Sequence, residues 1–520
     1  MCKKAFFSFL VFLFAQVCFS QAQETVQTKS DQILSQIKAA DIKTAEKNVA
    51  ALQRDFAGSP QLTGNLITIA WAYAERPECF EQAKDIFSFV AKDFPNSSQA
   101  AESRVYSFVM DTRLKLRDGD TAKVEAVIVK MRAENLSNPT LPKGLCTVAW
   151  AYAEKPECFE QAKYLFDSVV KDFPSSYEAT EARIYSIMMS VKLKLRSGDI
   201  AEAEAVVAKM RAEKLSNYAL PNSLYNIAWA YAERSEWFER AKDLFKSVAK
   251  DFPDFYQAAD AGLYGVMMDA RIKLRDGDIA GAESVVAGMR AGNSSNPALP
   301  NALYTIAWAY TDKPECFDKA KDLFKSVGKD FPDFIHSAGA RLYGKVLEDL
   351  ALIASQDNAR SKKSLDKLIS NLNESPYLAD AIDLIMGWYQ KKISAVEMPV
   401  NEDYRSPIEV WEKMTEKLPN LQFRYPDPYL FAAYYYGQTG EHNKAIQCYN
   451  KVLNKWPNYE YAWNVQYLVG STYQEMKHAG LISEADADTA TRQAYEQLIA
   501  KYPGSQTAQI ANRWLKGNKK

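Results

Sequence analysis

Histidine is scarce in this chain of 520 residues, and the only three are His336, His442 and His478. They do not form a His-Glu-x-x-His zinc motif, and the sequence has neither a glycine-rich phosphate loop nor a Cys-x-x-Cys pair. Carboxylates are plentiful, but they fall on the polar faces of expected helices, where charge is normal. These absences predict a protein that is not an enzyme and that holds no metal or cofactor.

A surplus of charge of one sign is also missing, because 64 Lys and Arg balance 65 Asp and Glu. Such a chain has no overall field that favours nucleic acid or an anionic membrane surface. After the N-terminus, no stretch approaches about 18 consecutive apolar residues, the usual threshold for a membrane helix. We therefore expect no nucleic-acid partner and no stable membrane insertion.

Residues 1–22 have the features of a secretory signal peptide. Two lysines precede an apolar run from Ala5 to Ala15, and small residues follow at Ser20 and Ala22. The apolar run is too short to span a bilayer comfortably. This pattern predicts cleavage near Ala22 and an exported protein, either periplasmic or secreted.

Cysteines are few, with seven in the chain and two of them in the signal region. Cys18 follows Val17, where a lipoprotein signal normally has a small residue, so a lipid anchor is not expected. Cys79, Cys158 and Cys316 stand too far apart in a stack of helices to form disulfides with each other. We interpret them as small apolar residues at helix starts, in preference to partners in intermolecular disulfides.

Four segments of the chain are nearly identical and reveal a long internal repeat. They read IAWAYAERPECF, VAWAYAEKPECF, IAWAYAERSEWF and IAWAYTDKPECF, and their tryptophans are Trp71, Trp150, Trp229 and Trp308. Each tryptophan follows the previous one by 79 residues. A fixed spacing over this distance indicates duplicated structural units.

Each unit has the apolar period of helices. In the first unit, Leu66, Ile69 and Tyr73 lie on one face of a helix, and a second apolar stripe follows the break at Pro77. Another long helix is expected to end at Gly119, which suits a left-handed cap, and Asp120 can cap the helix after it. The sequence therefore predicts four helices, or two hairpins, in each period.

This pattern is similar to that of the tetratricopeptide repeat (TPR) family, which places bulky, small and aromatic residues at fixed positions of a helical hairpin. The resemblance implies an all-α fold, a right-handed α-solenoid of TPR-like helical hairpins with two hairpins per 79-residue unit. The matching residues of the first unit are Leu66, Ile69, Ala70, Tyr73, Ala83, Phe87 and Pro95, and those of a later copy are Tyr429, Ala433, Tyr436, Gly440, Ala445, Tyr449 and Pro457.

The domain organisation follows from where this pattern holds and where it lapses. We expect a signal peptide at 1–22 and a TPR-like solenoid at 23–394. Five prolines interrupt residues 395–428, which predicts an irregular linker or hinge there. Residues 429–520 are expected to form a smaller C-terminal TPR-like domain.

The repeated tryptophans are the main candidates for partner binding. The TPR resemblance implies that Trp71, Trp150, Trp229 and Trp308 turn toward the concave groove, with an acidic residue four positions later on the same side. The alternative is that each tryptophan is a core residue, copied by duplication. The acidic residues are Glu75, Glu154, Glu233 and Asp312, and Tyr225 and Tyr304 are expected to widen the aromatic stripe.

These features predict an exported scaffold for protein–protein interactions in the cell envelope or periplasm, whose partner is a protein or an extended peptide segment. One alternative is a structural subunit of an outer-membrane or secretion assembly, because the final hairpins resemble those of envelope assembly proteins. Another is a carbohydrate-binding or carbohydrate-active helical protein, since Trp and carboxylates suit sugars. A glycosidase, however, needs two carboxylates at a defined separation, which repeated copies do not specify.

Overall fold

The computed structural model describes residues 25–212, 219–354, 377–394, 396–417, 423, 425–457, 459 and 461–518. These residues form 24 α-helices and four short 3-10 helices, and none of them lies in a β-strand. The predicted all-α fold is confirmed. The predicted signal peptide, 1–22, lies outside the described residues.

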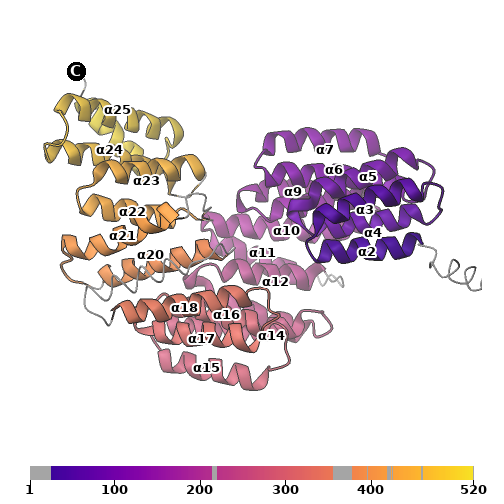
Figure 1. The fold of residues 1–520 in the computed structure, drawn as a ribbon, viewed down its shortest axis with the longest axis horizontal. Helices are drawn as coiled ribbons and strands as arrows, with labels where there is room; N and C mark the ends of the chain where they lie inside the picture. The colour runs from indigo at the N-terminus through magenta and orange to yellow at the C-terminus, as the bar shows by residue number, and fades with distance from the viewer. Residues whose placement is uncertain are drawn as a thin grey trace, which may run out of the picture. The chain divides into compact units, whose positions relative to one another are not determined.

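The chain divides into two compact units between Phe255 and Tyr256. Figure 1 labels most of the helices named below. Unit one contains two leading helices, two full periods and the first hairpin of the third period. Its elements are α2 (Val26–Lys38), α3 (Ile42–Asp55), α4 (Leu62–Ala74), η1 (Pro77–Cys79), α5 (Phe80–Asp93), α6 (Ala100–Arg117), α7 (Thr121–Asn135), α8 (Leu141–Ala153), η2 (Pro156–Cys158), α9 (Phe159–Asp172), α10 (Tyr177–Ser197), α11 (Ile200–Ala212), α12 (Ala219–Tyr231), η3 (Ser235–Trp237) and α13 (Phe238–Asp251).

Unit two contains the rest of the repeats and the helices that follow them. Its elements are α14 (Ala258–Arg275), α15 (Ile279–Gly292), α16 (Leu299–Tyr310), η4 (Pro314–Cys316), α17 (Phe317–Asp330), α18 (Ser337–Ala354), α20 (Leu378–Ser394), α21 (Asn401–Lys417), α22 (Asp427–Gln438), α23 (His442–Lys455), α24 (Ala462–His478), α25 (Glu484–Lys501) and α26 (Gln506–Gly517).

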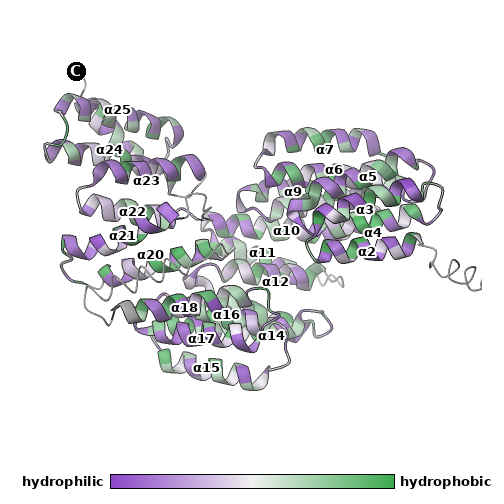
Figure 2. Ribbon diagram, viewed as in Figure 1, coloured by the Kyte–Doolittle hydropathy of each residue, from purple (hydrophilic) through white to green (hydrophobic). Residues whose placement is uncertain are grey.

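The apolar stripes seen in the sequence form the core between these helices. Figure 2 shows hydrophobic and hydrophilic residues interleaved along the helices, as amphipathic helices require. In α4 and α5, Leu66, Ala70, Ala83 and Phe87 are fully buried, and Tyr73 is almost so. The small residues Ala70 and Ala83 let the two helices of the hairpin approach closely. The positions that carry the TPR resemblance are thus the packing positions.

The turns of the repeat use the residues that the sequence singled out. Gly119, Gly198 and Gly277 adopt positive φ angles of 79°, 81° and 85°, where a side chain would be strained. Asp120 accepts a hydrogen bond from the backbone N–H of Lys123 at 3.2 Å, which caps α7. A short 3-10 helix, such as Pro77–Cys79, joins the first two helices of the period at the break that Pro77 marks.

A recurring set of polar contacts joins neighbouring hairpins along their second helices. In unit one, Arg132 of α7 donates to Asp172 of α9 at 2.7 Å and also contacts Ser168. Arg211 of α11 makes the same pair of contacts with Ser247 and Asp251 of α13. The three positions recur with the 79-residue period, so this contact between neighbouring hairpins has a copy in the next period.

The predicted linker, 395–428, differs most from the structure. It lies inside unit two, and α21, with Pro407 in its interior, occupies much of it. A proline inside a helix costs about 3 kcal/mol. Tyr404, Ile408 and Trp411 follow helical spacing and are all buried, so their packing offsets that cost. The division into a solenoid, 23–394, and a C-terminal domain, 429–520, stays a prediction.

The carboxylate of Asp383, on α20, makes the stability of unit two dependent on pH. Burial raises the pKa of Asp383 to about 6, and Asp427 and Asp380 add to this effect. Because the folded state holds a proton that the unfolded state releases near pH 4, stability falls as pH rises from about 4 to 6. We expect Asp383→Asn to increase the unfolding free energy at pH 7.5 by up to about 3 kcal/mol.

Urea unfolding of the wild type and the Asp383→Asn variant at pH 7.5 and pH 4 measures this effect. At pH 4 the two proteins should have nearly equal stability, because Asp383 is then protonated in the folded state. An equal gain at both pH values would show that the effect does not come from the carboxylate charge.

Candidate functional site: the Trp face of the repeats

The four repeated tryptophans lie on the first helix of each period and are neither fully buried nor fully exposed. Trp71 (α4), Trp150 (α8) and Trp229 (α12) belong to unit one, and Trp308 (α16) belongs to unit two. Each tryptophan is half-buried, and at least one aromatic ring from the following helix packs edge-on against its indole. The position of these tryptophans in a concave groove stays a prediction.

Aromatic neighbours hold each indole in place. Trp71 packs edge-on against Phe87 of α5 at 5.4 Å and against Tyr106 of α6 at 4.6 Å between ring centroids. Trp150 repeats this arrangement with Phe166 at 5.7 Å and Tyr185 at 4.6 Å. Edge-to-face pairs at these distances are favourable and orient the rings. The exposed part of each indole is therefore presented in a fixed orientation.

Unit two contains the fourth copy. Trp308 packs edge-on against Phe324 at 5.4 Å and Tyr343 at 4.9 Å. Tyr304 is half-buried, lies 6.3 Å from Trp308 and stacks on His336 at 5.1 Å. Tyr304 therefore adjoins its tryptophan, as the sequence suggested.

Tyr225 does not widen the aromatic stripe as expected. Its side chain is only 9% exposed and packs edge-on against Phe245 at 5.6 Å and Phe255 at 6.4 Å. The helical spacing places Tyr225 beside Trp229 correctly, but two aromatic rings from outside α12 cover it. The spacing of residues within α12 could not predict that rings from elsewhere in the chain pack on Tyr225.

The acidic residues four positions after each tryptophan are all exposed. They are Glu75, Glu154, Glu233 and Asp312. Each lies at the C-terminal end of its helix, where the helix dipole gives no stabilisation to a negative charge. Their placement in the repeat therefore has no explanation in helix stability alone.

Basic residues that the sequence analysis missed accompany these acids. In unit one, Arg113 of α6 lies 3.8 Å from Glu154, and its guanidinium lies over the ring of Phe80 at 4.5 Å. Lys192 of α10 lies over the ring of Phe159 at 5.3 Å, and its charge lowers the pKa of Glu233. Neighbouring protein atoms partly desolvate the carboxylate of Glu233, and this larger effect raises its pKa overall although the residue as a whole is exposed.

The third basic residue of this set belongs to unit two. Burial lowers the pKa of Arg271, on α14, to about 10, and the charge of Asp312 opposes this shift. Asp312 also accepts a hydrogen bond from Lys391 at 3.3 Å, and the same ammonium donates to the carbonyl of Thr311 at 2.5 Å. Arg113, Lys192 and Arg271 are 79 residues apart, a period that could have revealed them from the sequence.

In unit one these residues define what we call the Trp face. It consists of the tryptophans and acids of α4, α8 and α12 together with the basic residues of α6 and α10. The sign of the charge thus alternates between the first helices of successive hairpins, α4, α6, α8, α10 and α12. The charged residues, in this order, are Glu75, Arg113, Glu154, Lys192 and Glu233. The sequence predicted only acidic residues beside the tryptophans, whereas the structure adds basic residues that alternate with them.

Other kinds of site are not evident in the part of the chain that the structure describes. There, no group of three or more His, Cys, Asp or Glu side chains is placed to hold a metal ion. None of the described helices is both long enough and apolar enough to cross a membrane. Cys79, Cys158 and Cys316 are buried at the starts of second helices, and burial raises the pKa of each thiol.

Comparison with known proteins gives matches of two kinds. Residues 222–254 and 429–459 match the tetratricopeptide repeat family model. No curated protein matches the sequence significantly. The first of the two matched segments belongs to the third period and ends in unit one, and the second covers α22 and α23.

Several solved structures are similar over much of the chain. The human IFIT1 dimer with m7Gppp-AAAA is 18% identical, with 91% of this chain and 84% of that chain covered and a TM-score of 0.32. A tetratricopeptide repeat protein from Parabacteroides merdae is 15% identical, with 57% and 97% covered and a TM-score of 0.27. The APC/C hetero-tetramer Cut9-Hcn1 is 11% identical, with 96% and 98% covered and a TM-score of 0.25.

The chain is a TPR-like helical repeat protein. The family matches and the buried signature residues of α4 and α5 agree on this assignment. Repeats of this kind imply a scaffold for protein–protein interactions.

Proposed function

We propose that this protein is an exported, non-catalytic scaffold of the cell envelope or periplasm that holds an extended segment of a partner protein along the Trp face. The observation that carries the proposal is the state of Trp71 and Trp150. Each is fixed by edge-on contacts with two aromatic rings and still presents part of its indole to solvent. Rigid, partly exposed tryptophans are frequent anchors of protein interfaces.

The charges of the Trp face favour a protein partner over a nucleic acid. A polyanion needs a continuous positive surface, because its affinity comes mainly from phosphate contacts. On the Trp face, acids and bases alternate between neighbouring helices, so a uniform row of phosphates would meet repulsion at every second helix. A polypeptide, which carries side chains of both signs, can match this alternation.

Export is the second element of the proposal, and residues 1–22 support it. Two lysines, an apolar run and small residues near Ala22 have the order of a secretory signal. We expect the protein isolated from its native cells to begin near Gln23 and to fractionate outside the cytoplasm. Intact-mass measurement of that protein would contradict this element if residues 1–22 were still present.

Truncation of one anchor provides the test of the binding role. We expect Trp150→Ala to weaken binding of the partner segment at least tenfold, because a central tryptophan anchor contributes about 2 kcal/mol or more. Crosslinking and mass spectrometry of the full-length protein in its native envelope identify the crosslinked segment. The affinity of that segment, made as a peptide, is then measured for each variant.

Tyr164→Asp is the matched control, because this side chain is 69% exposed on α9 and the other three periods have aspartate at this position. The control should bind like the wild type.

Iodide quenching gives an independent check: Trp150→Phe should lower the quenchable fraction of fluorescence, whereas Trp411→Phe, at a buried position, should not. Equal affinity of the wild type and Trp150→Ala for the segment would overturn the proposal.

A further inference from the structure

Methionine is distributed very unevenly between the core and the surface of this protein. Met1 falls in the predicted signal peptide, and the structure describes the other twelve methionines. Met398 is 82% exposed, whereas none of the remaining eleven is more than 4% exposed. Those eleven are Met110, Met131, Met188, Met189, Met210, Met267, Met268, Met289, Met386, Met414 and Met476.

Met398 lies in the loop that joins α20 to α21 in unit two. At the start of this loop, the backbone N–H of Val396 donates to the carbonyl of Ile393 at 3.0 Å. At its end, the N–H of Val400 donates to the carboxylate of Asp403 at 2.8 Å, and the N–H of Asp403 donates to the carbonyl of Val400 at 2.9 Å. Both ends of the loop are thus held to the helices, and the Met398 side chain between them faces solvent.

This exposure matters because the thioether of methionine reacts with peroxides, and its accessibility decides how fast. A thioether needs no deprotonation before it reacts, so an exposed methionine is a target at neutral pH. A buried methionine reacts only when the helices around it open, and such openings are rare in a packed core. The fold therefore protects eleven of the described methionines and leaves Met398 unprotected.

The cysteines compete poorly for the same oxidants. Four of the five cysteines after the signal region are buried, and the fifth, Cys146, is half-buried. Burial raises the pKa of all five thiols, to about 12 in Cys146 and Cys448. Because the thiolate is the form that attacks an oxidant, these cysteines should react slowly at neutral pH.

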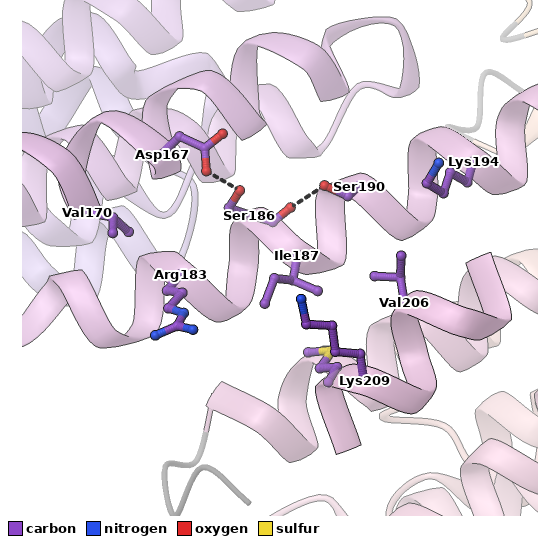
Figure 3. A pocket seen from close by; sticks show the side chains of 10 residues that line it. Asp167, Val170, Arg183, Ser186, Ile187, Ser190, Lys194, Val206 and Lys209 are labelled. Atoms are coloured by element: carbon purple, nitrogen blue, oxygen red, sulfur yellow. Dashed lines mark hydrogen bonds between the residues drawn. The ribbon is translucent and has the colours of Figure 1, made fainter. Parts of the chain in front are cut away.

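Among the buried methionines, the strongest competitor is Met210, which lines a cavity between α9, α10 and α11 (Figure 3). The cavity has a volume of about 580 Å³. A water molecule takes up about 30 Å³ in the liquid, so the cavity has room for hydrogen peroxide. The Met210 side chain is nevertheless fully buried. We therefore expect it to react more slowly than Met398.

We propose that Met398 is the site at which peroxides modify this protein in its native state. The sulfur lone pair attacks one oxygen of hydrogen peroxide, so that an S–O bond forms and the O–O bond breaks. The proton of the attacked oxygen passes to the departing hydroxide, which leaves as water. The sulfur loses two electrons, the peroxide gains two, and the product is methionine sulfoxide. This modification site is on a loop of unit two and goes beyond the Trp-face function.

Oxidation at this position should change the surface of the loop and leave the fold intact. Val396 and Val400, on either side of Met398, are also exposed, so the three side chains form a short apolar row. A sulfoxide places a polar group in the middle of this row. Because Met398 itself buries little surface, we expect the oxidised protein to unfold at the same urea concentration as the unoxidised protein.

The test is a time course of oxidation by hydrogen peroxide at neutral pH, with the full chain and peptide mass spectrometry. In the native protein, Met398 should be oxidised at least tenfold faster than any of the other eleven methionines. In concentrated urea the same peroxide should oxidise all twelve at rates within about threefold of each other, because the fold no longer protects any of them. This comparison separates exposure from any intrinsic difference between the peptides.

Two variants assign the fast reaction to one residue. Met398→Leu keeps an aliphatic side chain of similar size on the surface and should abolish the fast oxidation. Met414→Leu is the matched control, because it makes the same substitution at a buried position of α21 and should leave the fast oxidation of Met398 unchanged. Circular dichroism checks that both variants fold.

Three results would overturn the proposal. The first is another methionine, or a cysteine, that is oxidised as fast as Met398 in the native protein. The second is a fast oxidation that persists in Met398→Leu. The third is a large loss of stability when Met398 alone is oxidised, since that would place its side chain in the packed core.

Discussion

Replacing Phe166 with alanine is expected to destabilise unit one by about 3–5 kcal/mol, because the change leaves a cavity that the surrounding helices cannot fill. Phe166 is fully buried on α9 and contacts Trp150 of α8 and Tyr185 of α10, at 5.7 and 5.5 Å between ring centroids. It therefore joins two consecutive hairpins. In a repeat protein much of the stability comes from such contacts between neighbours, so the loss should extend beyond α9 itself.

Urea unfolding followed by circular dichroism at 222 nm measures this loss. Tyr164→Asp on the same helix is the control, because its side chain is largely exposed and three other periods carry aspartate there. The control should change the unfolding free energy by less than about 0.5 kcal/mol. A similar stability for Phe166→Ala and Tyr164→Asp would contradict the packing assigned to α9.

The second large effect is expected at Gly470 of α24, where alanine should destabilise unit two by about 2–3 kcal/mol. A Cβ atom at this position would lie 2.3 Å from Cε1 of Tyr495. The ring of Tyr495 cannot move away easily, because it stacks on Tyr467 at 5.5 Å and packs edge-on against Trp514 at the same distance. Helix α24 must therefore shift away from α25 to accept the methyl group.

Gly387 offers a matched control inside another helix of unit two. No atom lies within 4 Å of the position that its Cβ would take, so alanine there meets no obstacle. Because alanine favours a helix over glycine by about 1 kcal/mol, Gly387→Ala should stabilise the protein slightly. Thermal unfolding of both variants decides the matter, and a gain in stability for Gly470→Ala would exclude the close packing of α24 against Tyr495.

The sequence predicted the repeated helices well because their signals are local and are copied four times. Apolar spacing marked the helix faces, and glycine followed by aspartate marked the stops that Gly119 and Asp120 make. Helix α21 escaped prediction because its prolines are a strong local signal against a helix. The burial of Trp411 and its neighbours, which outweighs that signal, depends on helices far along the chain.

The candidate site was predicted only in part for a similar reason. The tryptophans and acids lie within one short segment of each period, so their spacing was visible. Arg113 and Lys192 lie on different helices from Glu154 and Glu233, 41 residues earlier in each case. Only the fold brings these charges together. The cover over Tyr225 likewise comes from Phe245 and Phe255, which no spacing within α12 could indicate.

The alternating charges of unit one limit how a bound segment could move along it. Suppose that a bound segment advances by one hairpin, from α4 to α6 or from α8 to α10. Each of its charges then lies opposite a residue of the same sign, which repels it. An advance by two hairpins restores every pairing and also brings the next indole under the same side chain. The Trp face would therefore accept a partner in discrete positions one full period apart, and a partner that carries two copies of the segment could occupy two of them at once.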